Sequence, residues 1–326
     1  MAELRWNPLI KDWVMIASNR QGRPQMPKDW CPFCPGSGKV PEAFDVYEYD
    51  NDFPALKQNP DEPDPVGTDF FKTAESYGKC EVILYSPEHT VTLPDLSDAH
   101  VGKLVDLWCE RFTALAADGK IKYVFIFENR GAVVGVTMPH PHGQIYGYSY
   151  VPKKLELEVE AAREHRKETG VCLFCDIIKN ETEFGKRIIF RNEHFTVLLP
   201  FYSEYPYGVY IYANRHMPYI TDMTEEEGKS LARTVKETVG MLDSLFGNAF
   251  PYMMCMHNAP VNVGDMSEDF HFHIEFFPPM RSKDKQKFNA SSETGAWAHC
   301  NPTCPEENAE ELRAAYKRFI EKESKK

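Results

Sequence analysis

A short arrangement of potential metal ligands occurs twice along this chain, in the same order both times. Each copy begins with a Cys-x-x-Cys pair, continues with an isolated histidine and ends with a His-x-His pair. Asn129, ahead of the first His-x-His pair, has an expected counterpart in Asn258, ahead of the second. The offset between the copies varies only by amounts that loops absorb, which indicates an internal duplication of one structural unit. The predicted ligands are Cys31, Cys34, His89 and His140 in the first copy, and Cys172, Cys175, His216 and His271 in the second.

Two cysteines from a tight turn and two histidines from elsewhere in a fold form a common shell of a structural zinc ion. Because the protein then fills all four positions, no place remains for a catalytic water. We therefore predict two structural zinc ions per chain, with iron as another candidate at the second site. The competing interpretation is that each Cys-x-x-Cys pair is a redox pair or two packed thiols, and that the histidines are unrelated to it.

The length of 326 residues suits two domains, which we expect at 1–168 and 169–326. The formal net charge of −12 argues against nucleic acid or an anionic membrane as a partner, although a few local arginines still allow an anionic substrate. The chain begins with a polar segment, contains no apolar run long enough to cross a bilayer, and carries nine cysteines that need not form disulfides. We expect a cytoplasmic protein.

Predicted strands and helices come mixed along the chain, and neighbouring strands are typical of hairpins rather than of regular βαβ units. One helix opens on a capping box made by Thr224 and Glu227. These features predict an α+β fold with mainly antiparallel sheet. The expected helices are 97–119, 155–168, 224–246 and 305–323. The expected strands include 121–128, 144–151, 187–192, 195–200, 207–212, 252–259 and 271–277.

The segment 127–144 carries the clearest chemical signal. His140 and His142 are two residues apart, so that an extended segment places both on one face. If His140 binds zinc, its ring is fixed and His142 is presented beside it toward a pocket. Glycines in the same segment let backbone N–H groups approach an anion closely. A neutral imidazole is a good nucleophile near pH 7, so the combination favours phosphoryl or nucleotidyl transfer over two histidines merely packed against a glycine loop.

The motifs FENRG and HPHGQ, with Gly135 between them, resemble the active-site motif of the galactose-1-phosphate uridylyltransferase family, part of the histidine triad superfamily. The resemblance extends over nearly the whole chain and implies two tandem histidine-triad-like halves, each a mainly antiparallel sheet with helices. Further similar segments are DWVMIASNRQGRP, NDFPAL, SPEHTVTLPDL, RNEHFTVLLPFYSEYP, FPYMMCMHNAP and FFPPMRSKDKQKF.

By this resemblance, His142 attacks the α-phosphorus of UDP-glucose, releases glucose 1-phosphate and passes UMP to galactose 1-phosphate in a ping-pong sequence. Gln144 corresponds to the family residue that hydrogen-bonds the phosphoryl oxygens. In the family the sugar-phosphate loop reaches the active site of the other subunit, which implies a homodimer with shared sites. The other implied substrate-binding residues are Arg20, Arg23, Asn51 and Asp52 for the nucleotide, Asn129 and Thr137 for the phosphates, and Lys287, Phe288 and Glu293 for the sugar phosphate.

The second half departs from the family pattern in its metal ligands. The best-known members bind a second metal through a glutamate and three histidines, and Glu158, His257 and His273 lie near those positions. We prefer the shell that contains the second Cys-x-x-Cys pair. His273 is then a vestigial copy of the nucleophile, with Glu275 at the position that Gln144 holds in the first half.

The choice of acceptor sugar stays open, because the loop 289–302 also differs from the family pattern around a shared glutamate. Two alternatives to uridylyl transfer remain. One is an ADP-glucose phosphorylase-like nucleotidyltransferase, which resembles this chain in having two Cys₂His₂ sites but carries serines where this chain has HPHGQ. The other is a zinc-stabilised module that binds nucleotides without turnover.

Overall fold

The computed structural model describes residues 2–21 and 30–325. Arg23, one of the expected nucleotide-binding residues, lies outside these described residues. No helix within them is both long enough and apolar enough to span a bilayer.

A nine-stranded sheet forms the centre of the molecule, and all of its neighbouring strands are antiparallel. The predicted α+β class with mainly antiparallel sheet is therefore confirmed. In spatial order, the strands are β3 (Tyr47–Asp50), β5 (Gly78–Leu84), β7 (His142–Tyr148), β6 (Tyr123–Arg130), β11 (Tyr252–His257), β12 (His273–Phe277), β10 (Tyr210–Ala213), β9 (Phe195–Leu198) and β8 (Ile188–Arg191).

The order of the strands shows the duplication directly. β6 pairs with β11 in the middle of the sheet, and the strands on either side follow the sequence β3-β5-β7-β6 in one direction and β9-β10-β12-β11 in the other. The strand that follows or contains the His-x-His pair, β7 or β12, thus lies directly beside the central pair in each half. The expected boundary at 168/169 lies at the end of the helix that follows β7.

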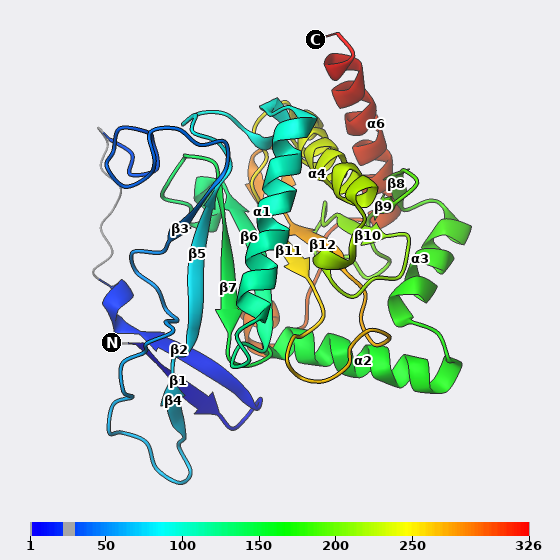
Figure 1. Ribbon diagram of the computed structural model, residues 1–326. Helices are drawn as coiled ribbons and strands as arrows, with labels where there is room; N and C mark the ends of the chain where they lie inside the picture. Colours follow the sequence, from blue (N-terminus) through cyan, green and yellow to red (C-terminus); the bar gives the residue numbers. More distant parts are fainter. Residues whose placement is uncertain (1, 22–29, 326) are drawn as a thin grey trace.

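Two equivalent helices, α1 (Asp98–Ala116) and α4 (Glu225–Phe246), cover one face of the sheet side by side (Figure 1). Each buries an apolar stripe against the strands, α1 through residues that include Leu104 and Trp108. The predicted capping box is present: the Glu227 N–H donates to Thr224 Oγ1 at 3.2 Å, and the Thr224 N–H donates to Glu227 at 2.8 Å.

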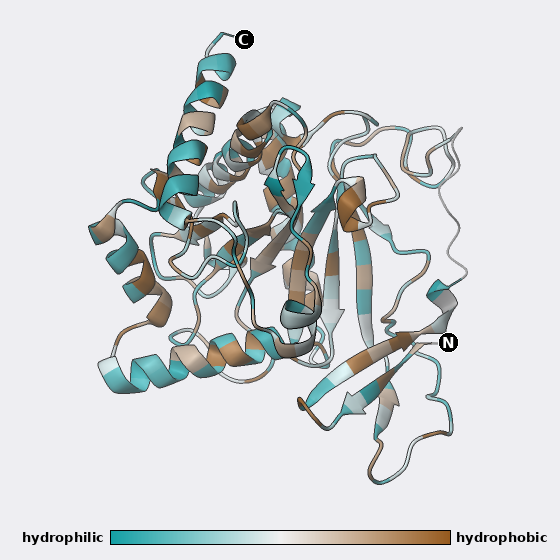
Figure 2. Cartoon of the chain, turned by 180° about the vertical axis from the view of Figure 1, so that it is seen from behind, coloured by the Kyte–Doolittle hydropathy of each residue, from teal (hydrophilic) through white to brown (hydrophobic). Residues whose placement is uncertain are grey.

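Three further helices surround this core: α2 (Lys153–Thr169), α3 (Leu173–Phe184) and α6 (Pro305–Glu323). α6 packs against α4, and α2 runs along one end of the second half in both views (Figure 1, Figure 2). The second Cys-x-x-Cys pair lies at the start of a helix: Cys172 is the N-cap of α3 and Cys175 lies in its first turn.

The opposite face of the sheet carries an aromatic layer and the smaller elements. Tyr123, Phe125, Phe127 and Tyr146 belong to this layer, which continues toward a three-stranded sheet near the N-terminus. This small sheet projects from the body of the molecule (Figure 1). Its strands are β1 (Ala2–Asn7), β2 (Asp12–Ala17) and β4 (Thr73–Glu75), and the C-terminal half adds β13 (Met280–Ser282), β14 (Lys285–Gln286) and α5 (Ser291–Ala296).

Candidate active site and metal clusters

The structure brings together the four predicted ligands of the first cluster, Cys31, Cys34, His89 and His140. One ligand atom from each lies within 4.8 Å of the others. Cys34 Sγ is 3.4 Å from His89 Nδ1 and 3.5 Å from His140 Nδ1, and Cys31 Sγ is 3.8 Å from His140 Nδ1. The S···N edges of a tetrahedral zinc shell are about 3.5 Å long, given the usual Zn–S and Zn–N distances. This donor set therefore fits zinc without rearrangement.

Backbone contacts orient the imidazole of His140 for this role. Its Nε2–H donates to the Ser86 carbonyl oxygen at 2.8 Å, which leaves the lone pair of Nδ1 toward the two sulfur atoms. His140 is buried, and burial lowers its pKa to about 4, so that the ring is neutral and suited to binding a metal.

His142, at the start of β7, is held by the residue that precedes it on the same face. Its Nδ1 lies 2.8 Å from the His140 carbonyl oxygen. Because a carbonyl oxygen only accepts, Nδ1 carries the proton and the lone pair is at Nε2. The ring of Phe33 packs edge-on against both imidazoles, at centroid distances of 6.1 Å to His140 and 5.6 Å to His142. The first cluster thus directly orients the His142 ring and sets the tautomer that its neutral form adopts.

Gln144 lies on the same face of β7, opposite Phe127 of β6. Its side-chain oxygen accepts a hydrogen bond from the Tyr146 hydroxyl at 3.2 Å, which orients the amide so that its nitrogen serves as a donor. Burial raises the pKa of Tyr146, while a hydrogen bond with the guanidinium of Arg20 acts in the opposite direction. Arg20 therefore lies on the face of β7 that carries His142 and Gln144.

The predicted phosphate loop joins β6 to β7. Asn129 lies two residues beyond Phe127 on β6, on the same face of the sheet as Gln144, and continuing the register brings it level with His142. Gly131 has a φ of +99°, and a Cβ atom there would approach Pro251 to 2.8 Å, so this position requires glycine. Thr137 is exposed within the loop.

Asn51 and Asp52 follow β3 at the edge of the first half. The Asn51 side chain accepts from the Phe53 N–H at 2.9 Å, and Asp52 accepts from the Tyr49 hydroxyl at 2.7 Å. Both side chains are thus ordered by neighbouring groups.

The second predicted cluster, Cys172, Cys175, His216 and His271, is also brought together, with its ligand atoms within 4.8 Å of one another. Cys175 Sγ is 3.7 Å from His216 Nδ1 and 3.5 Å from His271 Nδ1. His271 Nε2–H donates to the Ala213 carbonyl oxygen at 2.8 Å, as His140 does to Ser86. Hydrogen bonds from Cys175, His216 and His271 lower the pKa of Cys172, which favours the thiolate that a metal needs.

The second half repeats the arrangement of the nucleophile but encloses it. His273 Nδ1 lies 2.9 Å from the His271 carbonyl oxygen, as His142 Nδ1 lies from His140. However, only 1% of His273 is exposed, and aromatic rings surround its imidazole. The centroid distances are 5.0 Å to Phe174, 5.3 Å to Tyr212, 5.9 Å to Phe270 and 6.4 Å to Tyr210.

Glu275 occupies the place of Gln144 and forms a charged network. It lies opposite Cys255, just as Gln144 lies opposite Phe127. Lys154 Nζ is 2.5 Å from Glu275, and His257 Nε2 is 3.4 Å from it. Although burial opposes its charge, His257 and Lys154 hold the pKa of Glu275 well below its usual range.

This register corrects one prediction. Because Phe127 and Cys255 are equivalent, the counterpart of Asn129 is His257, and not Asn258 as the sequence suggested. Asn258 is buried, and its side-chain oxygen accepts from the Ile220 N–H at 2.7 Å. His257 lies 2.9 Å from Glu158 and, with His273, forms a third group whose ligand atoms lie within 4.8 Å. The structure therefore gathers these three residues and the Cys₂His₂ set separately, with His271 in the latter.

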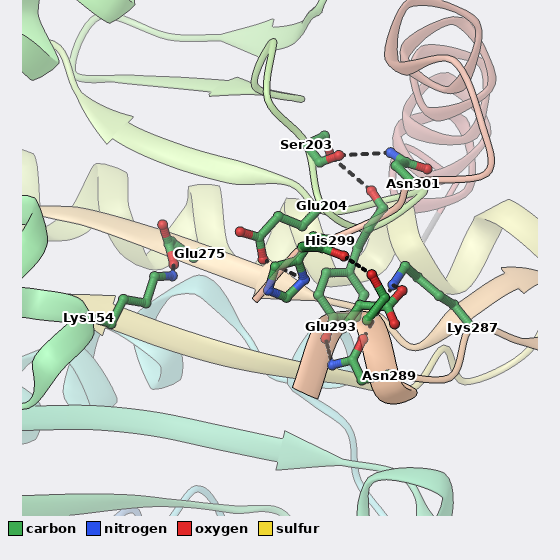
Figure 3. Close-up of polar contacts among 12 residues, drawn as sticks. Lys154, Ser203, Glu204, Glu275, Lys287, Asn289, Glu293, His299 and Asn301 are labelled. Atoms are coloured by element: carbon green, nitrogen blue, oxygen red, sulfur yellow. Dashed lines mark hydrogen bonds and ion pairs between the residues drawn. The ribbon is translucent and has the colours of Figure 1, made fainter. Parts of the chain in front are cut away.

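The predicted sugar-phosphate residues belong to the C-terminal half. Lys287 is buried, lies 3.6 Å from Glu293, and stacks over the Tyr205 ring at 5.0 Å. Figure 3 shows Lys287 and Glu293 pointing toward one another, with Asn289 beside them. Phe288, by contrast, is 70% exposed. The sequence alone did not single out Tyr205 or the contact of His299 with Glu204 at 3.4 Å, because the partners in these contacts are far apart along the chain.

Comparisons with known proteins agree with this arrangement. The family model described as galactose-1-phosphate uridyl transferase, N-terminal domain, matches residues 1–152, and that of the C-terminal domain matches residues 158–320. The galactose-1-phosphate uridylyltransferase of Thermotoga maritima is 42% identical over 314 residues, which cover 96% of this chain and 98% of that protein. A uridylyltransferase structure is 31% identical, covers 98% of this chain and 99% of its own, and has a TM-score of 0.89. An ADP-glucose phosphorylase from Arabidopsis thaliana shares the fold, with a TM-score of 0.74 at 23% identity over 96% of this chain and 99% of its own.

Proposed function

Since the chain belongs to the galactose-1-phosphate uridylyltransferase family, we propose that it transfers UMP from UDP-glucose to galactose 1-phosphate through a uridylyl group on His142. The observation that carries the proposal is the hydrogen bond from His142 Nδ1 to the His140 carbonyl oxygen, which puts the lone pair at Nε2.

In the first half-reaction, the Nε2 lone pair of His142 forms a bond to the α-phosphorus of UDP-glucose. The bond from this phosphorus to the bridging oxygen breaks, and its electron pair leaves with glucose 1-phosphate. In the second, a phosphate oxygen of galactose 1-phosphate attacks the same phosphorus, the P–N bond breaks, and UDP-galactose departs. The imidazole returns to its starting state, so that the enzyme is unchanged over the cycle.

Gln144 lies on the His142 face of β7 and supports this chemistry, and the family resemblance assigns the other substrate contacts. The oriented amide of Gln144 donates to a phosphoryl oxygen, where negative charge grows in the transition state. Asn129 and Thr137 serve the phosphates from the adjoining strand and loop, Arg20 and Arg23 bind the nucleotide, and Asn51 and Asp52 bind ribose and uracil. Arginine suits phosphate through its forked donors, and carboxylate suits ribose hydroxyls.

The two Cys₂His₂ clusters each hold a structural zinc ion in this proposal, with iron as the alternative in the second. The ion in the first cluster supplies rigidity: it fixes His140, whose carbonyl oxygen in turn fixes the His142 ring. In the second cluster the same donor set clamps the start of α3 to the strand that follows His271.

We further propose a homodimer in which Lys287, Phe288 and Glu293 serve the active site of the other subunit. The exposed Phe288 beside the buried Lys287 supports this assignment, because an exposed aromatic next to an ordered ion pair is typical of a contact surface. We also propose the cytoplasm as the compartment, on the basis of the metabolic role of the family and the nine cysteines, all free of disulfides.

Covalent labelling tests the proposed function. The protein is incubated separately with UDP-glucose and ADP-glucose without an acceptor, and its intact mass and peptides are measured without acid, because P–N bonds are acid-labile. We expect a uridylyl group on the peptide that contains His142, and its discharge by galactose 1-phosphate. His142→Gly is the control and should remain unlabelled.

The other outcomes separate the alternatives. An adenylyl group from ADP-glucose would move the assignment to the phosphorylase-like nucleotidyltransferase. No label from either substrate, together with no release of glucose 1-phosphate, would leave a nucleotide-binding module and contradict the covalent mechanism.

A further inference from the structure

Behind the nucleophile, on the face of the sheet covered by α1 and α4, Tyr85 contacts the short segment that contains His142. Tyr85 directly follows β5, and its N–H donates to the Pro141 carbonyl oxygen at 3.0 Å. Its carbonyl oxygen accepts from His100 Nε2 at 2.7 Å, so that α1 holds it as well. Only 1% of Tyr85 is exposed.

The Tyr85 hydroxyl lies against Gly143, the residue after the nucleophile. A Cβ atom at Gly143 would come within 2.4 Å of this hydroxyl oxygen and 3.1 Å of the Phe127 carbonyl oxygen. Glycine at this position thus leaves the space that the phenol fills. Tyr85 therefore touches the chain on both sides of His142, at Pro141 through its N–H and at Gly143 through its hydroxyl.

A buried carboxyl group fixes the Tyr85 hydroxyl. Glu128 of β6 accepts from Tyr85 at 3.2 Å and from the Tyr252 hydroxyl of β11 at 3.0 Å. Burial raises the pKa of Glu128 to about 7, although the positive charge of the nearby Arg130 acts to lower it. The Arg130 guanidinium is itself paired with Asp243 of α4 at 2.8 Å and 3.0 Å. Glu128 thus joins a tyrosine from each half of the molecule.

The second half has other residues at the positions of Tyr85, Gly143 and Glu128. Leu84 pairs with His142 and Tyr212 pairs with His273, so along the strands Ala213 takes the position of Tyr85, while its carbonyl oxygen also takes the role that Ser86 has toward His140. By the same register, Ile274 replaces Gly143 and the buried Met256 replaces Glu128. The first half therefore combines Tyr85 with Gly143, whereas the second half has Ala213 and Ile274 at these positions. The apolar residues of the second half are also fully buried, so burial at this place in the fold does not require the polar set.

We propose that Tyr85, anchored by Glu128, is a positioning residue for UMP transfer, which holds the Pro141–Gly143 backbone and thereby aims Nε2 of His142 at the phosphorus. The inference rests on the proposed role of His142. A nucleophile must be held within a fraction of an ångström of its productive position, and loss of that alignment slows the chemical step without weakening substrate binding.

Single-turnover formation of the uridylyl enzyme from UDP-glucose tests the inference. The matched pair is Tyr85→Phe and Tyr252→Phe, since each removes one buried hydrogen bond to Glu128 but only Tyr85 contacts Gly143. We expect Tyr85→Phe to slow the step about tenfold at unchanged apparent affinity for UDP-glucose, and Tyr252→Phe to change it less than about twofold. Both should lower the melting temperature to a similar extent.

Variants of Glu128 extend the test. Glu128→Gln retains an oxygen acceptor for Tyr85 and should keep the rate within about threefold, whereas Glu128→Leu should resemble Tyr85→Phe. The double variant Tyr85→Phe/Glu128→Leu should be no slower than either single one, because the two residues act as a unit. If Tyr85→Phe fails to fold, Glu128→Leu against Tyr252→Phe makes the same comparison.

Equal rates for Tyr85→Phe and Tyr252→Phe in folded protein would reduce Tyr85 to a packing role and overturn the inference. A raised KM for UDP-glucose at an unchanged rate would overturn it too. If the unaltered protein forms no uridylyl enzyme, the proposed function fails first and the inference fails with it. These results are distinguishable because the adduct is measured in the unaltered protein.

Discussion

His142 and His273 occupy equivalent places in the two halves of the molecule, yet they differ in exposure and in the charge of the side chains around them. Both rings donate from Nδ1 to the carbonyl oxygen of the histidine two residues earlier. His142 is half-buried next to the neutral amide of Gln144. His273 is enclosed by aromatic rings next to the carboxylate of Glu275, which binds Lys154.

The difference separates what a duplicated fold preserves from what a reaction needs. The metal cluster, the His-x-His strand and the hydrogen bond that sets the histidine tautomer recur in both halves, because each stabilises the fold whether or not chemistry takes place. Access for a phosphate, a neutral donor at the position of Gln144, and the Tyr85–Gly143 contact occur on one side only. A carboxylate at the position of Gln144 would repel a phosphoryl group, so Glu275 alone is enough to distinguish the second half.

The largest expected effect comes from exchanging the two histidines for asparagine. His142→Asn should lower UMP transfer at least about a thousandfold, because the covalent route is lost. His273→Asn should lower it far less and act mainly on the melting temperature, since its ring is part of the packed interior. Steady-state rates and thermal unfolding of both variants measure the contrast. Comparable losses of activity would mean that the second half takes part in the chemistry.

Exchanging Gln144 and Glu275, which lie two positions after the two histidines, sharpens the comparison. Gln144→Glu should reduce kcat about a hundredfold, because a donor to the developing charge is replaced by a repelling carboxylate. Glu275→Gln is the reverse change in the other half, and it should destabilise the protein by removing the buried carboxylate that pairs with Lys154 at 2.5 Å, although Glu158 stays close to both Lys154 and His257. Kinetics and thermal unfolding of both variants provide the test. Retention of wild-type kcat by Gln144→Glu would remove Gln144 from the phosphate site.

Cysteine variants distinguish the two metal clusters. Cys34→Ser and Cys175→Ser should each reduce the bound zinc by one equivalent per chain. Only the first cluster includes the residue whose carbonyl oxygen holds the nucleophile, so Cys34→Ser should also cost about tenfold in activity, and Cys175→Ser should act mainly on stability. Metal analysis with activity per folded protein checks both statements. Equal losses of activity would argue that both metals support the same site.

The sequence alone predicted the parts of the molecule that depend on local spacing. The Cys-x-x-Cys pairs, the His-x-His strands and the capping box of α4 each lie within a few residues, and the repeated order of the first two was enough to place them in two equivalent halves. The ladder register also bears out Glu275 as the counterpart of Gln144.

Contacts between distant residues could not be predicted in this way. Glu128 and Tyr252 are 124 positions apart, and Lys154 and Glu275 are 121 apart, so only the pairing of β6 with β11 and the docking of α2 bring them together. Asn129 was assigned to Asn258 because both are asparagines near the same motif. The ladder assigns it to His257 instead, since position along a strand, and not residue type, decides which side chains are equivalent.

The smallest expected effect concerns the helices that the two halves place over the sheet. α1 is capped by Ser97, whose hydroxyl accepts from the His100 N–H, whereas α4 adds the carboxylate of Glu227, paired with Arg215 at 2.8 Å. Arg215 and the Thr224 N–H lower the pKa of Glu227 to about 2. A carboxyl whose pKa falls on folding stabilises the protein above its unfolded pKa, near 4.5, and this contribution is lost as the pH falls toward 2.

Glu227→Gln should therefore cost about 2 kcal/mol of unfolding free energy at pH 7, and this cost should shrink steadily below pH 4.5. Ser97→Ala in α1 should cost about 1 kcal/mol without such a pH dependence, because a hydroxyl cap carries no charge in this range. Denaturant unfolding at several pH values compares the two variants. A cost of Glu227→Gln that stays constant down to pH 3 would show that shape and neutral hydrogen bonding, rather than the ion pair with Arg215, hold the start of α4.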